Sequence, residues 1–211
     1  MAKGDLPKKL IGSIYSWAAD TVYEPLVVNG AFRIFGGRLN DLVRAQGSAA
    51  AGSAAGRPIL DLPVGTAAFT LPVAAASAGI VVGADIAEGM VRHAKVAAAE
   101  HGATNLVVVQ ADAHRLPFRT GAFGSVLCTN GLQVMPGRAA TLAELRRVLS
   151  DDGTLYVSLL NMPLLSAPTA PTLFMSRPEL KRSLEAAGFR VTRLERERLA
   201  TLLEAEPASR Q

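Results

Sequence analysis

Three carboxylates follow three apolar runs, in order along the chain. Asp61 stands in ILDLPVGTAAF (59–69), Asp85 ends IVVGAD (80–85), and Asp112 follows VVVQA (107–111). Short runs rich in β-branched residues are typical of buried strands. A carboxylate at such a place costs free energy unless a cation or hydrogen-bond donors meet it. Each acid taken alone fits a helix cap or a loop anchor, but three at successive strand ends favour a binding site.

The spacing of these acids indicates what each one binds. Asp61 suits a ligand ammonium group, and the turn that follows contains Gly65, which adopts positive φ and lets a ligand approach the backbone. We expect Thr66 to begin a helix whose free N–H groups attract an anion. Asp85 comes twenty residues after Gly65, a spacing at which an acid accepts hydrogen bonds from ribose hydroxyls. Asp112 is placed to accept from an exocyclic amine such as that of adenine.

Strands and helices alternate after residue 56, and they must position these acids. The pattern predicts strands at 58–62, 80–85, 106–110, 125–129 and 154–160, helices at 66–77, 88–101, 138–149 and 177–187, and two strands within 189–206. Ser176 is the expected cap of the last helix. The predicted fold is α/β, a doubly wound, Rossmann-like sheet of seven mostly parallel strands with helices on both faces. Ligands bind such sheets outside the carboxyl ends of the strands.

The chain before residue 57 is expected to form a separate part. Residues 1–46 carry bulky residues at helical spacing and predict a small helical lid, whereas AQGSAAAGSAAG (45–56) predicts a helix end followed by a flexible linker. The expected division is a lid at 1–46 and a compact binding domain at 57–206. The apolar N-terminal arm fits either a lid or a homodimer contact.

Composition excludes several classes of protein. With 49% hydrophobic and 19% charged residues, the chain is globular and not disordered. Its one cysteine, Cys128, rules out a disulfide framework and is expected in the core. The net charge is +4, but the arginines are scattered or lie in helical rows such as Arg146–Arg147, so we expect no nucleic-acid partner. We expect no stable membrane insertion, no metal site and a cytoplasmic protein.

The ordered motifs resemble those of a known family. The segments ILDLPVGTA, VVGADIAEGM, VVVQADAHRLPF, GSVLCTNGLQVMP, ELRRVLSDDGTLYVS and ELKRSLEAAGF are similar to those of class I S-adenosylmethionine-dependent methyltransferases. The likeness covers residues 57–205 and is nearest to the subgroup around the quinone-biosynthesis C-methyltransferases, whose members act on many small molecules. AADTVYEPLVVNG (18–30) resembles the segment in which a Tyr folds over the cofactor.

The resemblance implies a role for each loop residue. S-adenosylmethionine, or its product S-adenosylhomocysteine, would contact the following residues: Tyr23, Asp61, Pro63, Gly65, Thr66, Asp85, Ile86, Met90, Asp112, Ala113, Asn130, Gly131 and Leu132. The family's glycine-rich loop is altered here, because Pro63 removes one N–H donor and Ala67 adds a methyl group. A single methyl group is an adjustment of about 1 kcal/mol where the site relaxes. We therefore expect cofactor binding to survive.

The sequence indicates the methyl acceptor and the general base less closely than it indicates the cofactor site. The expected acceptor is a small molecule, with a hydroxyl of a lipid, sugar or aromatic compound preferred over a carbon atom. Candidate acceptor-binding residues are Gln133, Phe32 and Phe35, and candidate catalytic residues are His114, Glu24 and Tyr23. Two alternatives stay open: a non-catalytic binding protein that keeps the fold, and a nucleotide-dependent oxidoreductase, which would need G-x-G-x-x-G after the first strand.

Overall fold

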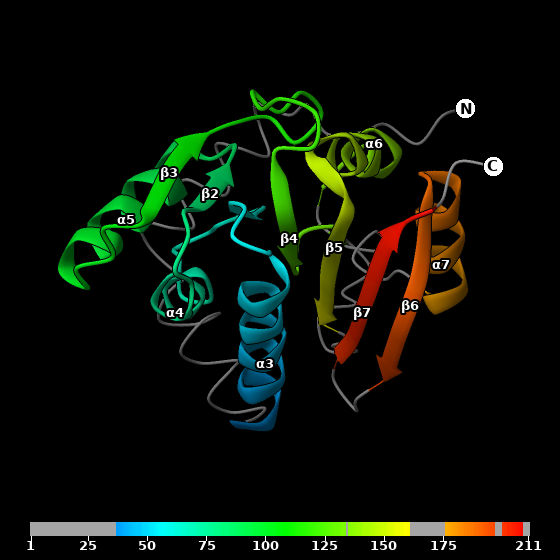
Figure 1. Ribbon diagram of the computed structural model, residues 1–211, viewed down its shortest axis with the longest axis horizontal. Coiled ribbons are helices and arrows are strands. Elements are labelled where there is room, and N and C mark those ends of the chain that lie inside the picture. Colours follow the sequence, from blue (N-terminus) through cyan, green and yellow to red (C-terminus); the bar gives the residue numbers. More distant parts are fainter. Residues whose placement is uncertain (1–36, 134, 161–175, 197–199, 209–211) are drawn as a thin grey trace, which may run out of the picture.

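The computed structural model describes residues 37–133, 135–160, 176–196 and 200–208. These residues form a seven-stranded sheet with the order β3-β2-β1-β4-β5-β7-β6, as Figure 1 shows. Strand β7 runs antiparallel to both of its neighbours, β5 and β6, and the other described strand pairs are parallel. The strand order reverses between β1 and β4, which is where ligands bind in doubly wound sheets. The predicted fold class is confirmed.

The strands match the apolar runs of the sequence closely. Their bounds are β1 Ile59–Asp61, β2 Val81–Asp85, β3 Leu106–Gln110, β4 Phe123–Thr129, β5 Leu149–Leu160, β6 Phe189–Arg196 and β7 Ala200–Pro207. Strand β5 begins earlier than predicted. The SDDG stretch (150–153) precedes the predicted strand at 154–160 and forms the irregular start of β5, where the register with β4 shifts between Phe123 and Ser125.

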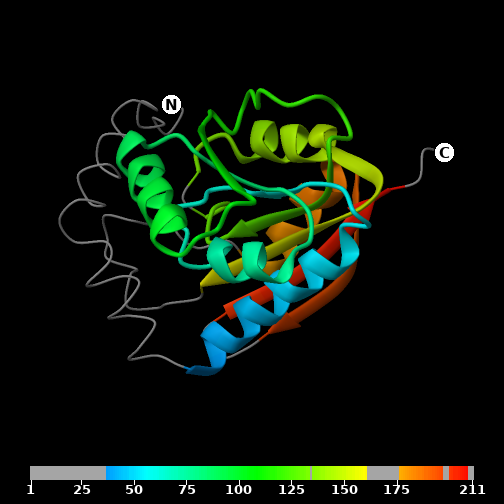
Figure 2. The same cartoon turned by 60° about the vertical axis from the view of Figure 1, so that its left-hand side comes forward.

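The helices cover both faces of the sheet. Their bounds are α3 Gly37–Ser53, α4 Thr70–Ala76, α5 Glu88–Glu100, α6 Arg138–Val148 and α7 Arg177–Ala186. Apolar residues of α3, α4 and α5 pack in one core cluster, and those of α6 and α7 in another on the opposite face. Figure 2 shows α3 and α4 lying along one face, with α6 beyond the strands. Ser176 caps α7 as predicted, since its hydroxyl accepts from the N–H of Glu179 at 3.3 Å.

The expected flexible linker is wrong over residues 45–53. This stretch is the second half of helix α3, and Ala50 is fully buried against the sheet. Its small residues serve close packing, because a Cβ on Gly47 would lie 2.8 Å from Val73. Gln46 donates to the carbonyl oxygens of Val157 and Leu203, which joins α3 to β5 and β7. Composition suggested flexibility, but these contacts make the segment part of the sheet's covering layer.

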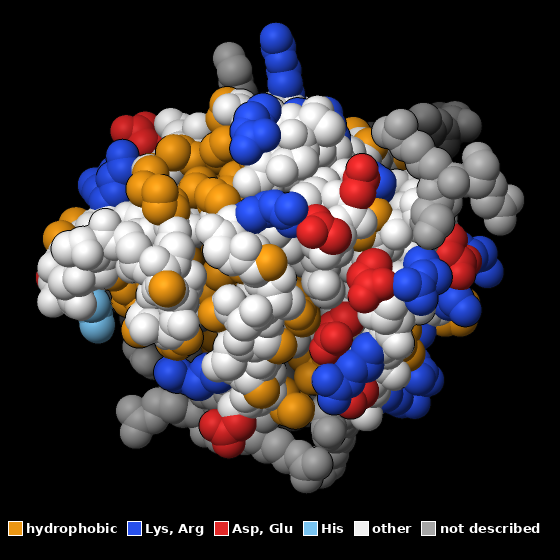
Figure 3. All heavy atoms as spheres, viewed as in Figure 1, with side chains coloured by type: hydrophobic (Ala, Val, Ile, Leu, Met, Phe, Trp, Pro, Cys, Tyr) orange, Lys and Arg blue, Asp and Glu red, His pale blue; other side chains and the backbone are white. Residues whose placement is uncertain are grey.

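The described surface carries interleaved charges. On β6 and β7, Arg190 pairs with Glu206, and Arg193 pairs with Glu195 and Glu204. Figure 3 shows basic and acidic side chains alternating along this side of the molecule. Within the residues that the structure describes, no helix combines the length and hydrophobicity that crossing a bilayer requires.

Candidate functional site

Asp61 ends β1 and lies inside the protein, with 3% of its surface exposed. One carboxylate oxygen, Oδ2, accepts a hydrogen bond of 2.5 Å from the hydroxyl of Thr70. The other, Oδ1, is buried and has no hydrogen-bond partner among the described residues. Burial raises the pKa of Asp61 to about 7, the Thr70 hydrogen bond opposes this rise, and the charge of Asp85 adds to it. The site therefore holds a buried acid, one of whose two oxygens lacks a donor among the described residues.

Asp85 ends β2 and joins the first two binding loops. Its Oδ2 accepts from the N–H of Gly65 at 3.1 Å, and its Oδ1 accepts from the N–H of Ala87 at 3.0 Å. Burial raises the pKa of Asp85, and these backbone donors oppose the rise. Each carboxylate oxygen has two lone pairs. Both oxygens therefore keep acceptor capacity for ligand hydroxyls while the carboxylate anchors the Gly65 turn.

The turn after β1 differs from the expected helix start. Helix α4 begins at Thr70 and not at Thr66, and residues between them form turns. Gly65 has φ +52°, and a Cβ built there would meet no atom of the described chain within 4 Å. The backbone at Gly65 therefore borders open space, as contact with a ligand requires. Pro63 is half-buried in the same turn, and Thr66 is buried.

Ala67 occupies the left-handed region, with φ +66°, where the family pattern has glycine. Its side chain is fully buried and packs in the core cluster with Val64 and Val73. Its N–H donates to the Val64 carbonyl, and its own carbonyl accepts from Thr70 and Leu71 at the start of α4. The added methyl group thus packs in the core.

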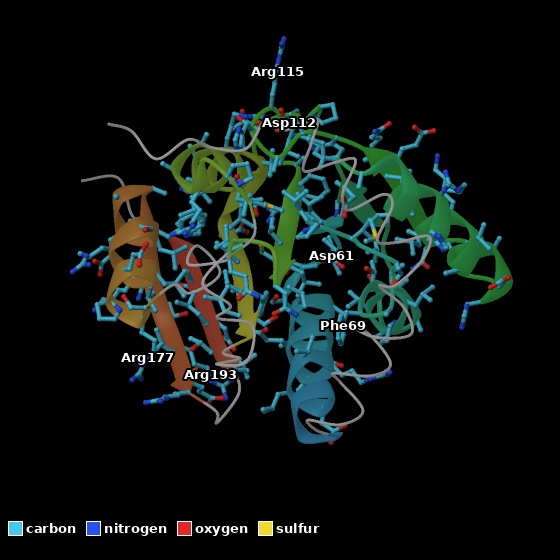
Figure 4. All side chains as sticks on the ribbon, turned by 180° about the vertical axis from the view of Figure 1, so that it is seen from behind. Asp61, Phe69, Asp112, Arg115, Arg177 and Arg193 are labelled. Atoms are coloured by element: carbon cyan, nitrogen blue, oxygen red, sulfur yellow. The ribbon has the colours of Figure 1, made fainter. Side chains whose placement is uncertain are left out.

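The next two loops carry the residues that we expect beside adenine. Ile86 is 37% exposed directly after Asp85, whereas Met90 is buried in the first turn of α5. Asp112 and Ala113 follow β3 and are half-buried, and Asp112 Oδ1 accepts from the N–H of His114. Figure 4 shows Asp61 near the centre of the molecule and Asp112 in the loop at the top of the view.

The turn after β4 forms the fourth side of the site. Asn130 has φ +55° and donates its N–H to the Ser158 carbonyl at 2.8 Å. A Cβ on Gly131 would lie 2.4 Å from Cδ of Pro63, so only glycine lets this turn pack against the β1 turn. Leu132 is fully buried, and Gln133 is half-buried. The structure therefore brings the first and fourth loops into contact across the strand-order reversal.

The catalytic candidates fall into two groups. His114 lies in the loop after β3, where its Nε2 is 2.7 Å from the carbonyl oxygen of Pro136. This bond ties His114 to the segment before α6 and leaves Nδ1 for any proton transfer. Tyr23 and Glu24, together with the acceptor candidates Phe32 and Phe35, lie outside the described residues.

Sequence reasoning missed two contacts around the site. The Thr70 hydroxyl donates a hydrogen bond to Asp61. A threonine at a helix start usually bonds only its own backbone, so its type and position did not indicate this contact. Arg147, which the sequence showed only as part of a helical row of arginines, donates to the carbonyl oxygens of Leu116 and Phe118. Glu144 pairs with Arg147 and accepts from the N–H of Leu116. Helix α6 thereby fixes the loop that carries Asp112.

These residues fit S-adenosylmethionine on three structural grounds. Asp61 offers a free buried oxygen to an ammonium group, Asp85 offers acceptors to ribose hydroxyls, and Gly65 leaves space for close approach. The chain's net charge is positive, but two buried carboxylates give the site a local preference for a cationic ligand. No cluster of three or more His, Cys, Asp or Glu suited to a metal ion occurs in the described part of the chain.

Comparison with known proteins defines first the fold and then the family. The structure superposes on that of the 4+2 cyclase SpnF with a TM-score of 0.78 at 20% identity, covering 98% of this chain and 100% of that chain. A SAM-dependent methyltransferase from Aquifex aeolicus gives 0.70 at 19% identity, covering 96% of this chain and 98% of that one. At such identities the likeness establishes the fold alone, which is that of class I methyltransferases.

Sequence relatives then supply the family. Residues 59–153 match the family model described as "Methyltransferase domain". A demethylmenaquinone methyltransferase from Lactococcus lactis subsp. lactis is 35% identical over 116 residues, which covers 54% of this chain and 46% of that protein. A malonyl-(acyl-carrier protein) O-methyltransferase from Geobacter sulfurreducens is 34% identical over 151 residues, covering 63% and 55%. The chain thus spans about half the length of these relatives.

Residues 59–153 therefore match the methyltransferase domain family, which agrees with the predicted resemblance to class I S-adenosylmethionine-dependent methyltransferases. S-adenosylmethionine is the methyl donor that this match supports, as predicted from the motifs.

Proposed function

We propose that this protein transfers a methyl group from S-adenosylmethionine to a small-molecule acceptor. The observation that carries the proposal is the pair of buried carboxylates at neighbouring strand ends, one of which has an oxygen without a donor. The family match supports the same reading. We assign Asp61 to the methionine ammonium group, Asp85 to the ribose hydroxyls, and the loop of Asp112 and Ala113 to the adenine edge.

The chemistry asks little of the protein beyond alignment. When bound, the cofactor's sulfonium supplies an electrophilic methyl group with a neutral leaving group. Asp61 and Asp85 would hold the two ends of the adenosyl-methionine unit, and the turn at Asn130–Leu132 would border the reacting centre. Holding donor and acceptor in line accounts for most of the acceleration in such a displacement. A general base matters when the acceptor is a hydroxyl, because that group loses a proton on methylation.

We favour a hydroxyl acceptor over a carbon acceptor, with Gln133, Phe32 and Phe35 as acceptor-binding residues. One relative is a malonyl-(acyl-carrier protein) O-methyltransferase and another a demethylmenaquinone methyltransferase, so relatives differ in acceptor. Tyr23, Glu24 and His114 remain the candidate bases. The bond from Nε2 of His114 to the Pro136 carbonyl oxygen holds the ring in place and leaves Nδ1 for proton transfer.

Two measurements test the function. Calorimetric titration with S-adenosylhomocysteine should show saturable binding, and absence of heat at millimolar ligand contradicts the proposal. Incubation with methyl-labelled S-adenosylmethionine and a panel of lipids, quinones and sugars should then label one acceptor class. Cofactor binding without labelling of any acceptor would instead support the alternative of a non-catalytic binding protein.

Once an acceptor is known, substitutions can identify the general base through their effect on kcat. Glu24→Ala or His114→Ala should lower kcat about a hundredfold if that residue removes the acceptor proton. Gln133→Ala serves as a comparison, because Gln133 orients an acceptor but takes no proton, so its effect should fall mainly on KM. Near-normal kcat in both Ala variants would mean that neither residue is the base.

A further inference from the structure

Thr70 is buried beside Asp61, although no sequence pattern marked it as a residue of the site. It is the first residue of α4, it is fully buried, and its backbone N–H donates to the Ala67 carbonyl. Its hydroxyl has one proton, and that proton points to Oδ2 of Asp61 at 2.5 Å. A threonine in a helix has few accessible χ1 rotamers, so the hydroxyl is held in this direction.

The Thr70 bond makes the two oxygens of Asp61 unequal. Oδ2 has its donor, whereas Oδ1 is buried with none in the described residues. A carboxylate bonded on one side cannot rotate freely without losing that bond, so Oδ1 faces a fixed direction. A donor from outside the chain would complete the set, and the nearby charge of Asp85 favours a cationic donor.

We propose that Thr70 is a positioning residue that orients Asp61 so that its Oδ1 receives the ammonium group of the cofactor's methionine end. This inference rests on the proposed function and adds a residue to it. Thr70 acts through Asp61 and touches no reacting atom. Its effect is therefore confined to ligands that carry the amino-acid chain, and it does not extend to the adenosine part, which Asp85 and the Asp112 loop serve.

The test compares two ligands that differ only at the end in question. S-adenosylhomocysteine carries the ammonium group, and 5′-methylthioadenosine lacks the amino-acid chain. Thr70→Val removes the hydroxyl and keeps the shape of the side chain, so we expect it to weaken S-adenosylhomocysteine about tenfold or more, since hydrogen bonds to charged groups are strong. The affinity for 5′-methylthioadenosine should change less than threefold. Thr70→Ser restores the hydroxyl and should bind both ligands nearly as the wild type does.

A matched control is available on the opposite face. Thr141 is a fully buried threonine in α6 whose hydroxyl has no partner in the described residues. Thr141→Val removes the same atom from a similar environment and should leave both affinities unchanged. Equal losses for the two ligands in Thr70→Val, or no loss for either, would overturn the inference while leaving the proposed function intact. If the wild-type protein bound neither ligand, both the inference and the proposed function would be contradicted.

A second comparison covers the case in which Thr70→Val does not fold, because it needs only Asp61→Asn and the double variant. Removing the donor leaves a buried charge unpaired, and Asp61→Asn removes that charge. In the Asp61→Asn background, Thr70→Val should cost little further affinity for S-adenosylhomocysteine, because the two residues act as one unit. A further loss of tenfold or more in the double variant, relative to Asp61→Asn, would contradict the inference.

Discussion

Ionisation of Asp61, the buried acid at the end of β1, should lower the free energy of unfolding and raise the affinity for the cofactor, so the two quantities should change in opposite directions with pH. Burial raises the pKa of Asp61 from 3.8 to about 7 in the ligand-free protein. Between these values the folded state binds more protons at this site than the unfolded state does. Stability therefore falls as pH rises from about 4 to about 7, and the loss is complete above pH 7.

Asp61→Asn tests this sign and its size. A shift of three pKa units corresponds to about 4 kcal/mol at most, or about 1.4 kcal/mol per pH unit across the window. Asn keeps the size of the side chain and cannot ionise. We therefore expect the free energy of unfolding of the wild type to fall relative to that of the variant as pH rises. An offset that is independent of pH is expected as well, because the new amide N–H groups need acceptors.

The assay is urea denaturation followed by circular dichroism at half-unit steps from pH 4.5 to 8.5. The difference between wild type and Asp61→Asn should change by several kcal/mol over this range and level off above pH 7. Asp152→Asn is the control, since pairing with Arg57 lowers the pKa of exposed Asp152 and its titration lies below the range. A difference curve that is flat from pH 4.5 to 8.5 would refute the reasoning.

Ligand affinity should move the opposite way. S-adenosylhomocysteine needs the charged carboxylate, so wild-type affinity should rise by up to tenfold per pH unit below pH 7 and become constant above it. Asp61→Asn should bind more weakly at pH 8 and lose this slope. Calorimetry in buffers of different ionisation enthalpy should detect proton release by the wild type at pH 6, and its absence would contradict the assignment of Asp61.

Three further substitutions address the loops. Arg147→Ala should weaken S-adenosylhomocysteine binding severalfold, because it releases the loop that carries Asp112. The control is Arg193→Ala, which breaks ion pairs on distant β6 (Figure 4) and should leave this affinity unchanged. Equal effects of the two substitutions in titration would argue against this role for α6. Ala67→Gly should leave that affinity within threefold, because the methyl group packs in the core, and a larger gain by calorimetry would place the methyl group in the site. Gly131→Ala should lower the free energy of unfolding by about 1–3 kcal/mol, since its Cβ would meet Pro63, and an unchanged urea midpoint would be the contrary result.

The strands and their acids were predictable because both signals are local. Apolar runs of five to seven residues placed all the parallel strands, and the alternation with helices gave the layers. The carboxyl ends of parallel strands share one edge of the sheet, so Asp61 and Asp85 had to lie close together. Ser176 was equally readable, since its side chain caps its own helix.

Segments whose structure depends on distant partners were predicted less well. The Ala/Gly/Ser composition of residues 45–53 indicates flexibility in isolation, yet this stretch is helical because Ala50 packs on the sheet and Gln46 reaches two strands. The start of α4 lay four residues later than expected, because Ala67 takes a left-handed conformation that its sequence does not favour. Tertiary packing outweighed local preference in both places.

By itself the sequence determined the sheet and the order of its acids, because side-chain chemistry and strand periodicity are written residue by residue. Only the tertiary structure decided that Thr70 bonds one oxygen of Asp61 and leaves the other free, and that Arg147 holds the loop after β3. Those contacts join residues through folded backbone geometry, and hydrogen bonds need distances and directions that no sequence pattern specifies.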